Sequence, residues 1–186
     1  SKISYNFIDI NPKVKNIIFG AHLLNDDMIN SIPSNTIIFN TEQIESINEI
    51  WKRRILLLAS KGIVFWDYSN HNLDLLLTKL NVKGRLLEIG FQKNLQRIKM
   101  NDNKEVDVLF YGSLNNRREK IINSLLKNNV KVKCLFGVYG KDRDDWIGKS
   151  KIVLNLHYYE SKIFEIVRIF YLLTNAIPIV SEVDEN

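Results

Sequence analysis

Short apolar runs and amphipathic segments alternate along the first half of the chain. Four of the runs are typical of buried strands: residues 16–23, 36–43, 62–69 and 85–91. Over 41–62, apolar residues recur at helical spacing, with Thr41 available to cap the start of a helix and Gly62 to end it. A second helix is predicted to begin after a cap at Ser69. The alternation predicts an α/β unit over residues 1–91.

A polar stretch without periodicity, residues 92–105, interrupts the pattern and predicts a linker. The alternation then resumes, with strands predicted at 106–113, 131–140, 151–158 and 177–182 and helices at 117–129, 144–150 and 164–174. Residues 106–186 are therefore expected to form a second α/β unit. Because the strands are near-continuous apolar runs, we expect parallel sheets with helices on both faces.

Polar residues and glycines lie at the ends of most of the predicted strands. Ligands of parallel sheets bind beyond the carboxyl ends of the strands, so these residues are the first candidates for a binding site. They are His22, Asn40, Glu42, Asp67 and Ser69 in the first unit, and Gly112, Ser113, Gly140, His157, Tyr158 and Glu182 in the second. They would line a common cleft if the two units face each other.

The 186 residues are 45% hydrophobic and 25% charged, a composition that can bury a globular core. No apolar run reaches the roughly 18 residues that span a bilayer, and the N-terminal residues lack the pattern of a signal peptide. We therefore expect a cytoplasmic protein without a transmembrane segment. The net charge of +5 comes from dispersed Lys and Arg residues without a nucleic-acid motif, so no nucleic-acid partner is expected. Cys134 has apolar neighbours, which predict a buried thiol.

The stretch "FYGSLNNRREK", residues 110–120, combines a strand end, a glycine turn and a helix start that carries Arg117 and Arg118. Backbone N–H groups at the helix start, together with a guanidinium, would suit a diphosphate. It is neither a Walker loop nor a G-x-G-x-x-G fingerprint. The alternative is an ordinary strand-to-helix turn with surface arginines.

The stretch "FEIVRIFYLLTNAIPIVSE", residues 164–182, places Glu165 and Arg168 on an otherwise apolar helix that leads into a strand. A carboxylate in the first turn of this helix could accept both hydroxyls of a ribose. Because the two residues are three apart, the alternative is an ion pair on the helix surface.

Candidates for a catalytic base and for a metal site are less distinctive. Glu42, His22 and Asp67 each end a predicted strand of the first unit and could serve as the base. The favoured alternatives are a helix cap for Glu42, a hydrogen-bonded core residue for His22 and a turn residue for Asp67. "DRD", residues 142–144, matches an Asp-x-Asp metal motif by letter but is also typical of a helix start. The three histidines have no zinc spacing, and we expect no metal.

Several of these stretches together resemble a known family. In the second half, "DVLFYGSLNNRR", "FGVYGKDRDDWIGKSKIVLNLHYYE" and "FEIVRIFYLLTNAIPIVSE" resemble the nucleotide-sugar-binding half of GT-B glycosyltransferases, in the spore-maturation-like, family-1-type group found in bacteria and large viruses. In the first half, "IIFGAHLL", "IIFNTEQI" and "VFWDYSNHN" resemble the other half of the same enzymes. The resemblance implies two tandem Rossmann-like units facing each other, with the acceptor bound across the cleft.

The resemblance also implies roles for individual residues. By motif position, Gly112, Ser113 and Arg118 would contact the donor phosphates, Glu165 would bind the donor ribose, Arg168 belongs to the same signature, and His157 and Tyr158 lie where the donor base or sugar would be. The implied activity is a metal-independent, cofactor-free transfer of a hexose-type sugar from a nucleotide-diphosphate sugar to a glycan, protein or small-molecule acceptor.

The chain ends directly after a predicted strand, without the C-terminal helices that cross back to the first domain in GT-B enzymes. Either the family is compact, or the chain is a C-terminally truncated piece of a larger polypeptide. The alternative function is therefore a non-catalytic nucleotide- or glycan-binding module of a larger protein.

Overall fold

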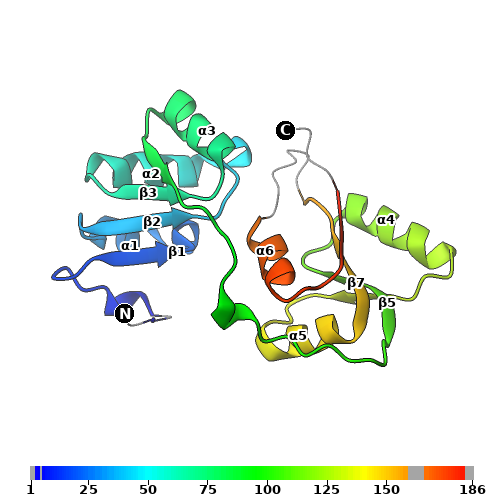
Figure 1. Ribbon diagram of the computed structural model, residues 1–186. Coiled ribbons are helices and arrows are strands. Elements are labelled where there is room, and N and C mark those ends of the chain that lie inside the picture. The colour runs from blue at the N-terminus through cyan, green and yellow to red at the C-terminus, as the bar shows by residue number, and fades with distance from the viewer. Residues whose placement is uncertain (1–2, 5, 159–165, 183–186) are drawn as a thin grey trace. The chain divides into compact units, whose positions relative to one another are not determined.

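The computed structural model describes residues 3–4, 6–158 and 166–182 (Figure 1). The chain divides into two compact units, Ser1–Glu88 and Ile89–Asn186. Each unit contains one four-stranded parallel sheet and is an α/β, Rossmann-like unit. Within the described ranges, no helix combines the length and apolar composition that crossing a membrane requires.

The sheet of the first unit follows the chain in the order β1-β2-β3-β4. Its strands are β1 (Asn16–Phe19), β2 (Thr36–Asn40), β3 (Val64–Asp67) and β4 (Gly84–Leu86). Its helices are α1 (Asp26–Ser31), α2 (Glu49–Ser60) and α3 (Asn70–Leu80), with short 3-10 turns η1 (Phe7–Asp9), η2 (Ala21–Leu23) and η3 (Ile44–Ser46). Right-handed crossovers that all step in one direction place their helices on one face of a sheet.

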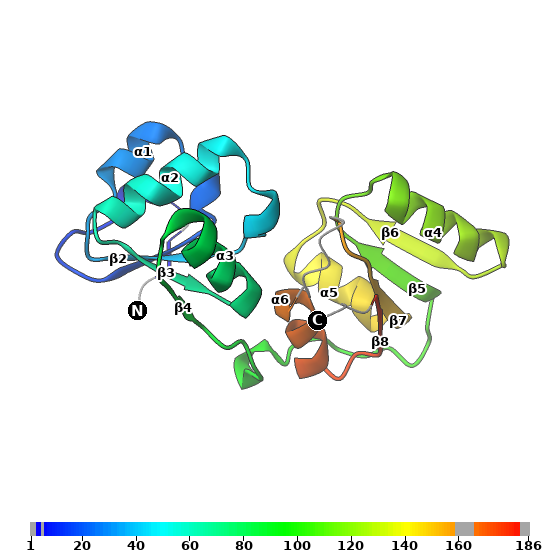
Figure 2. The same cartoon turned by 90° about the horizontal axis from the view of Figure 1, so that it is seen from above.

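The core of the first unit lies on that one face. Ile29 of α1, Ile55 of α2 and Leu76 of α3 join Ile38 and Phe65 of the central strands in a single buried cluster. Figure 2 shows these three helices on the same side of the sheet. The opposite face carries the alternate residues, of which Ile17, Phe19 and Val64 are exposed. The prediction of helices on both faces is therefore wrong for this sheet, as far as the described residues go, because the strand order never reverses.

The boundaries of α2 differ from the predicted helix over 41–62. The segment begins with η3, and α2 starts only at Glu49, where the Asn48 side chain accepts a hydrogen bond from the Trp51 N–H (2.8 Å). Thr41 therefore does not cap the helix. Ser69 does cap α3, as predicted, by accepting from the Asn72 N–H (3.3 Å).

The sheet of the second unit has the order β6-β5-β7-β8. Its strands are β5 (Val106–Tyr111), β6 (Val132–Leu135), β7 (Ser150–Asn155) and β8 (Ile179–Ser181). Its helices are α4 (Asn116–Lys127), α5 (Gly140–Gly148) and α6 (Ile166–Thr174), preceded by the 3-10 turn η4 (Lys93–Leu95). The chain moves outward from β5 to β6 and then returns to place β7 on the other side of β5.

This reversal puts helices on both faces of the second sheet. Ile122 of α4 packs with Val108, Phe110, Leu154 and Leu156 on one face. On the other face Ile147 of α5 and Leu172 of α6 pack with Leu109, Leu135, Val153 and Ile177. The second unit is therefore a doubly wound unit, as the apolar strands predicted. Cys134 lies on the edge strand β6 and is exposed, which corrects the prediction of a buried thiol.

Residues 92–105, predicted as a linker, belong to the second unit. The N–H groups of Arg97 and Ile98 both donate to Oδ1 of Asn175 (2.8 and 2.9 Å), and the Asn101 N–H donates to the Gly148 carbonyl (3.0 Å). A side chain at Gly148 would place its Cβ 2.2 Å from the carbonyl oxygen of Lys99. The segment therefore lies against the end of α5 through backbone and amide bonds, which leave no periodic pattern in the sequence.

Candidate ligand-binding site

The strand order identifies where a ligand would bind. In doubly wound sheets the ligand crevice lies outside the carboxyl ends of the two strands between which the order reverses. In the second unit these strands are β5 and β7. The first sheet has no reversal among its four strands. The candidate site therefore lies at the carboxyl ends of β5 and β7, the two central strands of the second sheet.

Gly112 follows β5 at this edge, and its backbone lies beside two guanidinium groups. Its φ is +133°, a conformation that favours glycine. A Cβ at this position would lie 3.3 Å from Nη2 of Arg168 and 3.8 Å from Nη1 of Arg118. Ser113, the next residue, is exposed. The Gly112 N–H donates to the Leu135 carbonyl (3.0 Å). The turn thus combines an exposed serine with nearby positive charge.

Arg118 is buried, with only 2% of its surface exposed. Its guanidinium donates to three backbone carbonyls: Nε to His157 (3.2 Å), Nη1 to Ser113 (2.7 Å) and Nη2 to Leu156. It also lies over the rings of Phe110 and Tyr158, 5.3 and 5.1 Å from their centroids. Arg118 therefore joins the end of β5 to the end of β7. Its contact with a donor phosphate stays a prediction, and the geometry favours a structural role.

Arg117 makes a second connection across the same edge. Its guanidinium binds both carboxylate oxygens of Glu182, with Nη1 3.0 Å from Oε2, and Oε2 also accepts from the His157 N–H (2.7 Å). Burial alone would raise the pKa of Glu182, but the bonds from Arg117 and from the His157 N–H outweigh it and leave that pKa below its usual value. Glu182 thus ties the end of β8 to the end of β7.

Arg168 is the arginine best placed to meet a ligand at the switch point. Its Nη1 donates to Oδ1 of Asn155 at the end of β7 (3.1 Å), and its guanidinium lies 5.1 Å from the ring centroid of Tyr111. The side chain is partly exposed. Arg168, Gly112 and Asn155 therefore lie close together at the carboxyl ends of β5 and β7. Glu165 lies outside the described residues.

The other predicted donor contacts differ in accessibility. His157 is buried, whereas Tyr158 is exposed. Sequence reasoning missed Asn155, which lies inside the strand predicted over 151–158 and ends the observed β7. Its Nδ2 donates to the Ser181 hydroxyl (3.0 Å). It also missed Tyr111. Burial raises the pKa of the Tyr111 hydroxyl to about 12, although the nearby Arg168 and Arg143 act to lower it. Both residues were hidden within apolar runs.

In the first unit, the structure brings two of the predicted base candidates together. Nε2 of His22 lies 3.3 Å from Oε1 of Glu42, and the side chains are 25% and 34% exposed. The His22 ring also meets the Trp51 ring edge-on, with centroids 6.2 Å apart. A carboxylate held against an imidazole is an arrangement that suits general-base chemistry.

Asp67, the third base candidate, is buried in a hydrogen-bond network. Its carboxylate accepts from Nδ2 of Asn40 (2.7 Å), the N–H of Ser69 (2.8 Å) and Nδ2 of Asn72 (3.2 Å). Desolvation raises the pKa of Asp67, against the effect of these bonds. The network connects the ends of β2 and β3, which is a structural role.

In the part of the chain that the structure describes, no three His, Cys, Asp or Glu side chains gather as a metal ion would require. The aspartates of "DRD" are separated in their surroundings: Asp142 is exposed in the first turn of α5, whereas Asp144 is buried and paired with arginines.

No family model matches the chain. It is similar to three proteins of Acanthamoeba polyphaga mimivirus. Uncharacterized protein L138 is 30% identical over 186 residues, which cover 96% of this chain and 20% of the relative. Uncharacterized protein L137 is 28% identical over 167 residues (86% and 22%), and uncharacterized protein L140 is 28% identical over 155 residues (80% and 49%). The chain thus spans about a fifth of the first two relatives and about half of the third.

Among solved structures, the chain is similar to the Glycosylation Associate Protein (Gap123) complex from Streptococcus agalactiae. The match has a TM-score of 0.46 and 11% sequence identity, and it covers 95% of this chain and 44% of that chain. A likeness at this level is too weak to transfer a function.

Proposed function

We propose that the chain is a GT-B-type glycosyltransferase whose second unit binds a nucleotide-diphosphate sugar. The observation that carries the proposal is the switch point of the second sheet, where the Gly112 backbone lies beside the Arg168 guanidinium. Backbone N–H groups at a helix start, together with a guanidinium, are groups that recognise diphosphates. Helix α4 begins at Asn116, directly after this turn. The resemblance of the second half to nucleotide-sugar-binding units supports the same ligand.

The proposal assigns the acceptor side to the first unit. His22 would take the proton from the acceptor hydroxyl, and Glu42 would orient the imidazole and stabilise the imidazolium that forms. Positioning of the two substrates would provide the rest of the acceleration, without a metal.

Titration with UDP, GDP, ADP and CDP tests the donor site. At least one nucleotide should release measurable heat and raise the melting temperature. Arg168→Met should weaken that binding about tenfold, the loss expected for one charge-assisted hydrogen bond worth ~1.4 kcal/mol. Arg85→Met, an equal loss of charge on an exposed residue of the first unit, is the matched control. Absence of any response from folded protein would reject the donor site.

Donor turnover tests catalysis separately. Transfer or hydrolysis of the donor sugar should disappear in His22→Gln and fall in Glu42→Gln, while nucleotide affinity stays unchanged because neither residue belongs to the second unit. Glu165→Ala, at the residue that the resemblance assigns to the ribose, should weaken nucleotide binding. Unchanged turnover in His22→Gln would remove the proposed base.

The second candidate is a non-catalytic nucleotide- or glycan-binding module. The observation behind it is that the mimivirus relatives carry far more chain than the matched part. This alternative predicts nucleotide or glycan binding by the chain without turnover of any donor sugar, and it would be rejected by turnover that depends on His22.

A further inference from the structure

Five side chains of the second unit alternate as guanidinium and phenol: Arg97, Tyr171, Arg143, Tyr111 and Arg168. The guanidiniums of Arg97 and Arg143 lie 5.4 and 4.8 Å from the ring centroid of Tyr171. Those of Arg143 and Arg168 lie 5.6 and 5.1 Å from the ring centroid of Tyr111. We name this series the arginine–tyrosine ladder. It begins in the segment after η4 and ends at the switch point.

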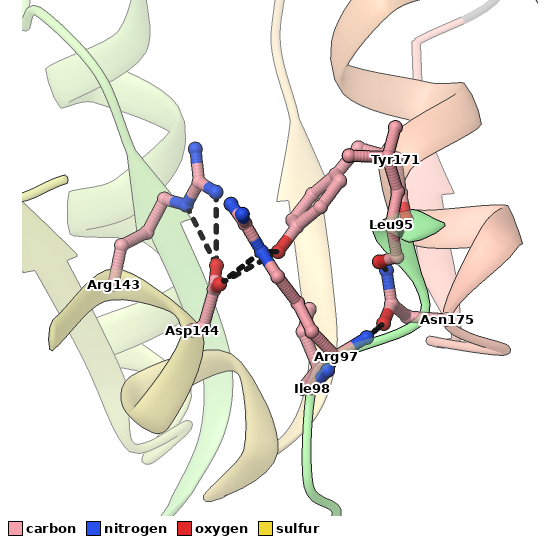
Figure 3. Close-up of polar contacts among 7 residues, drawn as sticks. All are labelled: Leu95, Arg97, Ile98, Arg143, Asp144, Tyr171 and Asn175. Atoms are coloured by element: carbon pink, nitrogen blue, oxygen red, sulfur yellow. Dashed lines mark hydrogen bonds and ion pairs between the residues drawn. The ribbon is translucent and has the colours of Figure 1, made fainter. Parts of the chain in front are cut away.

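One buried carboxylate holds the first half of the ladder. Oδ1 of Asp144 accepts from Nη2 and Nε of Arg143 (2.8 and 3.2 Å), and Oδ2 accepts from Nε of Arg97 (3.1 Å) and the Tyr171 hydroxyl (2.7 Å) (Figure 3). The two guanidiniums therefore reach the same carboxylate from different parts of the chain. Both carboxylate oxygens of Asp144 therefore already accept two hydrogen bonds each.

This arrangement leaves one positive charge without a contacting carboxylate, because two guanidiniums share a single aspartate. It also leaves donors free. In the described ranges, Arg97 donates hydrogen bonds only through Nε, and Arg143 only through Nε and Nη2. Both Nη groups of Arg97 and the Nη1 group of Arg143 are therefore available to a ligand. The side chains remain 51% and 20% exposed, so a ligand can reach them. Stacking on Tyr171 and bonding to Asp144 fix both groups in advance, which lowers the entropy cost of binding.

We propose that Arg97 and Arg143 form an anion site for a phosphate or pyrophosphate group. Several N–H donors on two adjacent guanidiniums match the several oxygens and multiple negative charge of such a group better than a single carboxylate would. The residues lie outside the donor contacts that the sequence predicted. Because Arg143 and Arg168 stack on the same tyrosine, the site continues from the switch point along one face of the unit.

Calorimetric titration of the full chain with inorganic pyrophosphate at constant ionic strength tests the site. Wild-type protein should bind, and Arg143→Gln and Arg97→Gln should each weaken binding about tenfold, as expected when one charged donor group is lost. Arg85→Gln removes the same charge from an exposed position of the first unit and should stay within about twofold of wild type. Equal binding by wild type and Arg143→Gln, or no binding by wild type, would overturn the proposal.

Hydrogen exchange of the wild-type protein tests the site without any substitution, so the result does not depend on whether a variant folds. Pyrophosphate should slow exchange in residues 95–98 and in α5, and leave the first unit unchanged. If the arginine–tyrosine ladder only fastens the segment after η4 to the helices, pyrophosphate will not alter exchange at these amides.

Nucleotides separate this proposal from the proposed function. If a nucleoside diphosphate binds and Arg143→Gln has no effect on either ligand, the donor site stands and the anion site fails. If pyrophosphate binding depends on Arg143 but no nucleoside diphosphate binds, the anion site stands and the donor site fails. If both ligands compete and both depend on Arg143, the anion site holds the phosphates of the nucleotide.

Discussion

Replacing Arg118 by methionine is expected to reduce stability rather than ligand binding. The residue is 2% exposed, and its guanidinium donates to three main-chain carbonyls at the ends of β5 and β7. Methionine keeps much of the length and the packing against Phe110 and Tyr158 but donates no hydrogen bond. The substitution therefore isolates the contribution of the three polar contacts.

The magnitude follows from those contacts. A hydrogen bond from a charged donor contributes about 1.5–3 kcal/mol, and an acceptor left buried without a partner carries a similar penalty. With three contacts and with relaxation of exposed carbonyls toward water, we expect a loss of about 4 kcal/mol. For a unit of about 100 residues this corresponds to a fall in Tm of about 20 °C.

The neighbouring Arg117→Met is the matched control. Its side chain is 40% exposed and its main partner is the Glu182 carboxylate, so its loss should cost about 1 kcal/mol. Calorimetric unfolding, combined with hydrogen exchange resolved by peptide, assigns each transition to its unit. Two results together would refute the structural role of Arg118. The free energy of unfolding of Arg118→Met would lie within about 1 kcal/mol of the wild-type value, and the variant would have lost nucleotide binding.

Three further substitutions test other parts of the structure. Gly112→Ala should cost about 1–3 kcal/mol, because its φ of +133° disfavours a side chain and the Cβ would lie 3.3 Å from Nη2 of Arg168; an unchanged Tm would contradict the geometry. Glu182 has a lowered pKa, so its stabilising effect is present above its unfolded-state pKa near 4.5 and is lost as pH falls through the lower folded-state pKa. The Tm difference between wild type and Glu182→Gln should therefore be largest near neutrality and shrink below pH 4.5; a difference constant with pH would contradict this. Asn48→Ala should cost ~1 kcal/mol in urea unfolding through the lost cap of α2, whereas Thr41→Ala should leave α2 unchanged.

The elements that the sequence predicted correctly depend on local signals. The Ser69 cap acts three residues away, and Gly62 ends α2 through its own positive φ of +74°. The split of the helix predicted over 41–62 depends on distant residues instead. Nδ2 of Asn72 donates to the Glu42 carbonyl (3.0 Å), and its Oδ1 accepts from the Ile44 N–H (3.0 Å) across 28 residues. Those bonds hold the start of the segment out of the helix, and no spacing along the chain indicates them.

The candidate site shows the same limit. Gly112 and Arg168 could be chosen from the sequence because a glycine turn and a charge on an apolar helix are visible there. The burial of Arg118 depends on a carbonyl 38 residues away, and the bond between Arg97 and the Tyr171 hydroxyl spans 74 residues. Residue type alone therefore could not separate an arginine that serves the fold from one that can meet a ligand.

Strand order explains why the two units use the polar residues at their strand ends differently. In the first sheet the helices all lie on one face. Asn40 and Asp67, the last residues of β2 and β3, are hydrogen-bonded to each other, and Asp67 also accepts from Asn72 of α3. In the second sheet α4 packs on one face and α6 on the other, and the glycine turn after β5 lies beside Arg168 of α6. Handed crossovers between strands, rather than the residue types that end them, therefore decide that the ligand site should be sought in the second unit.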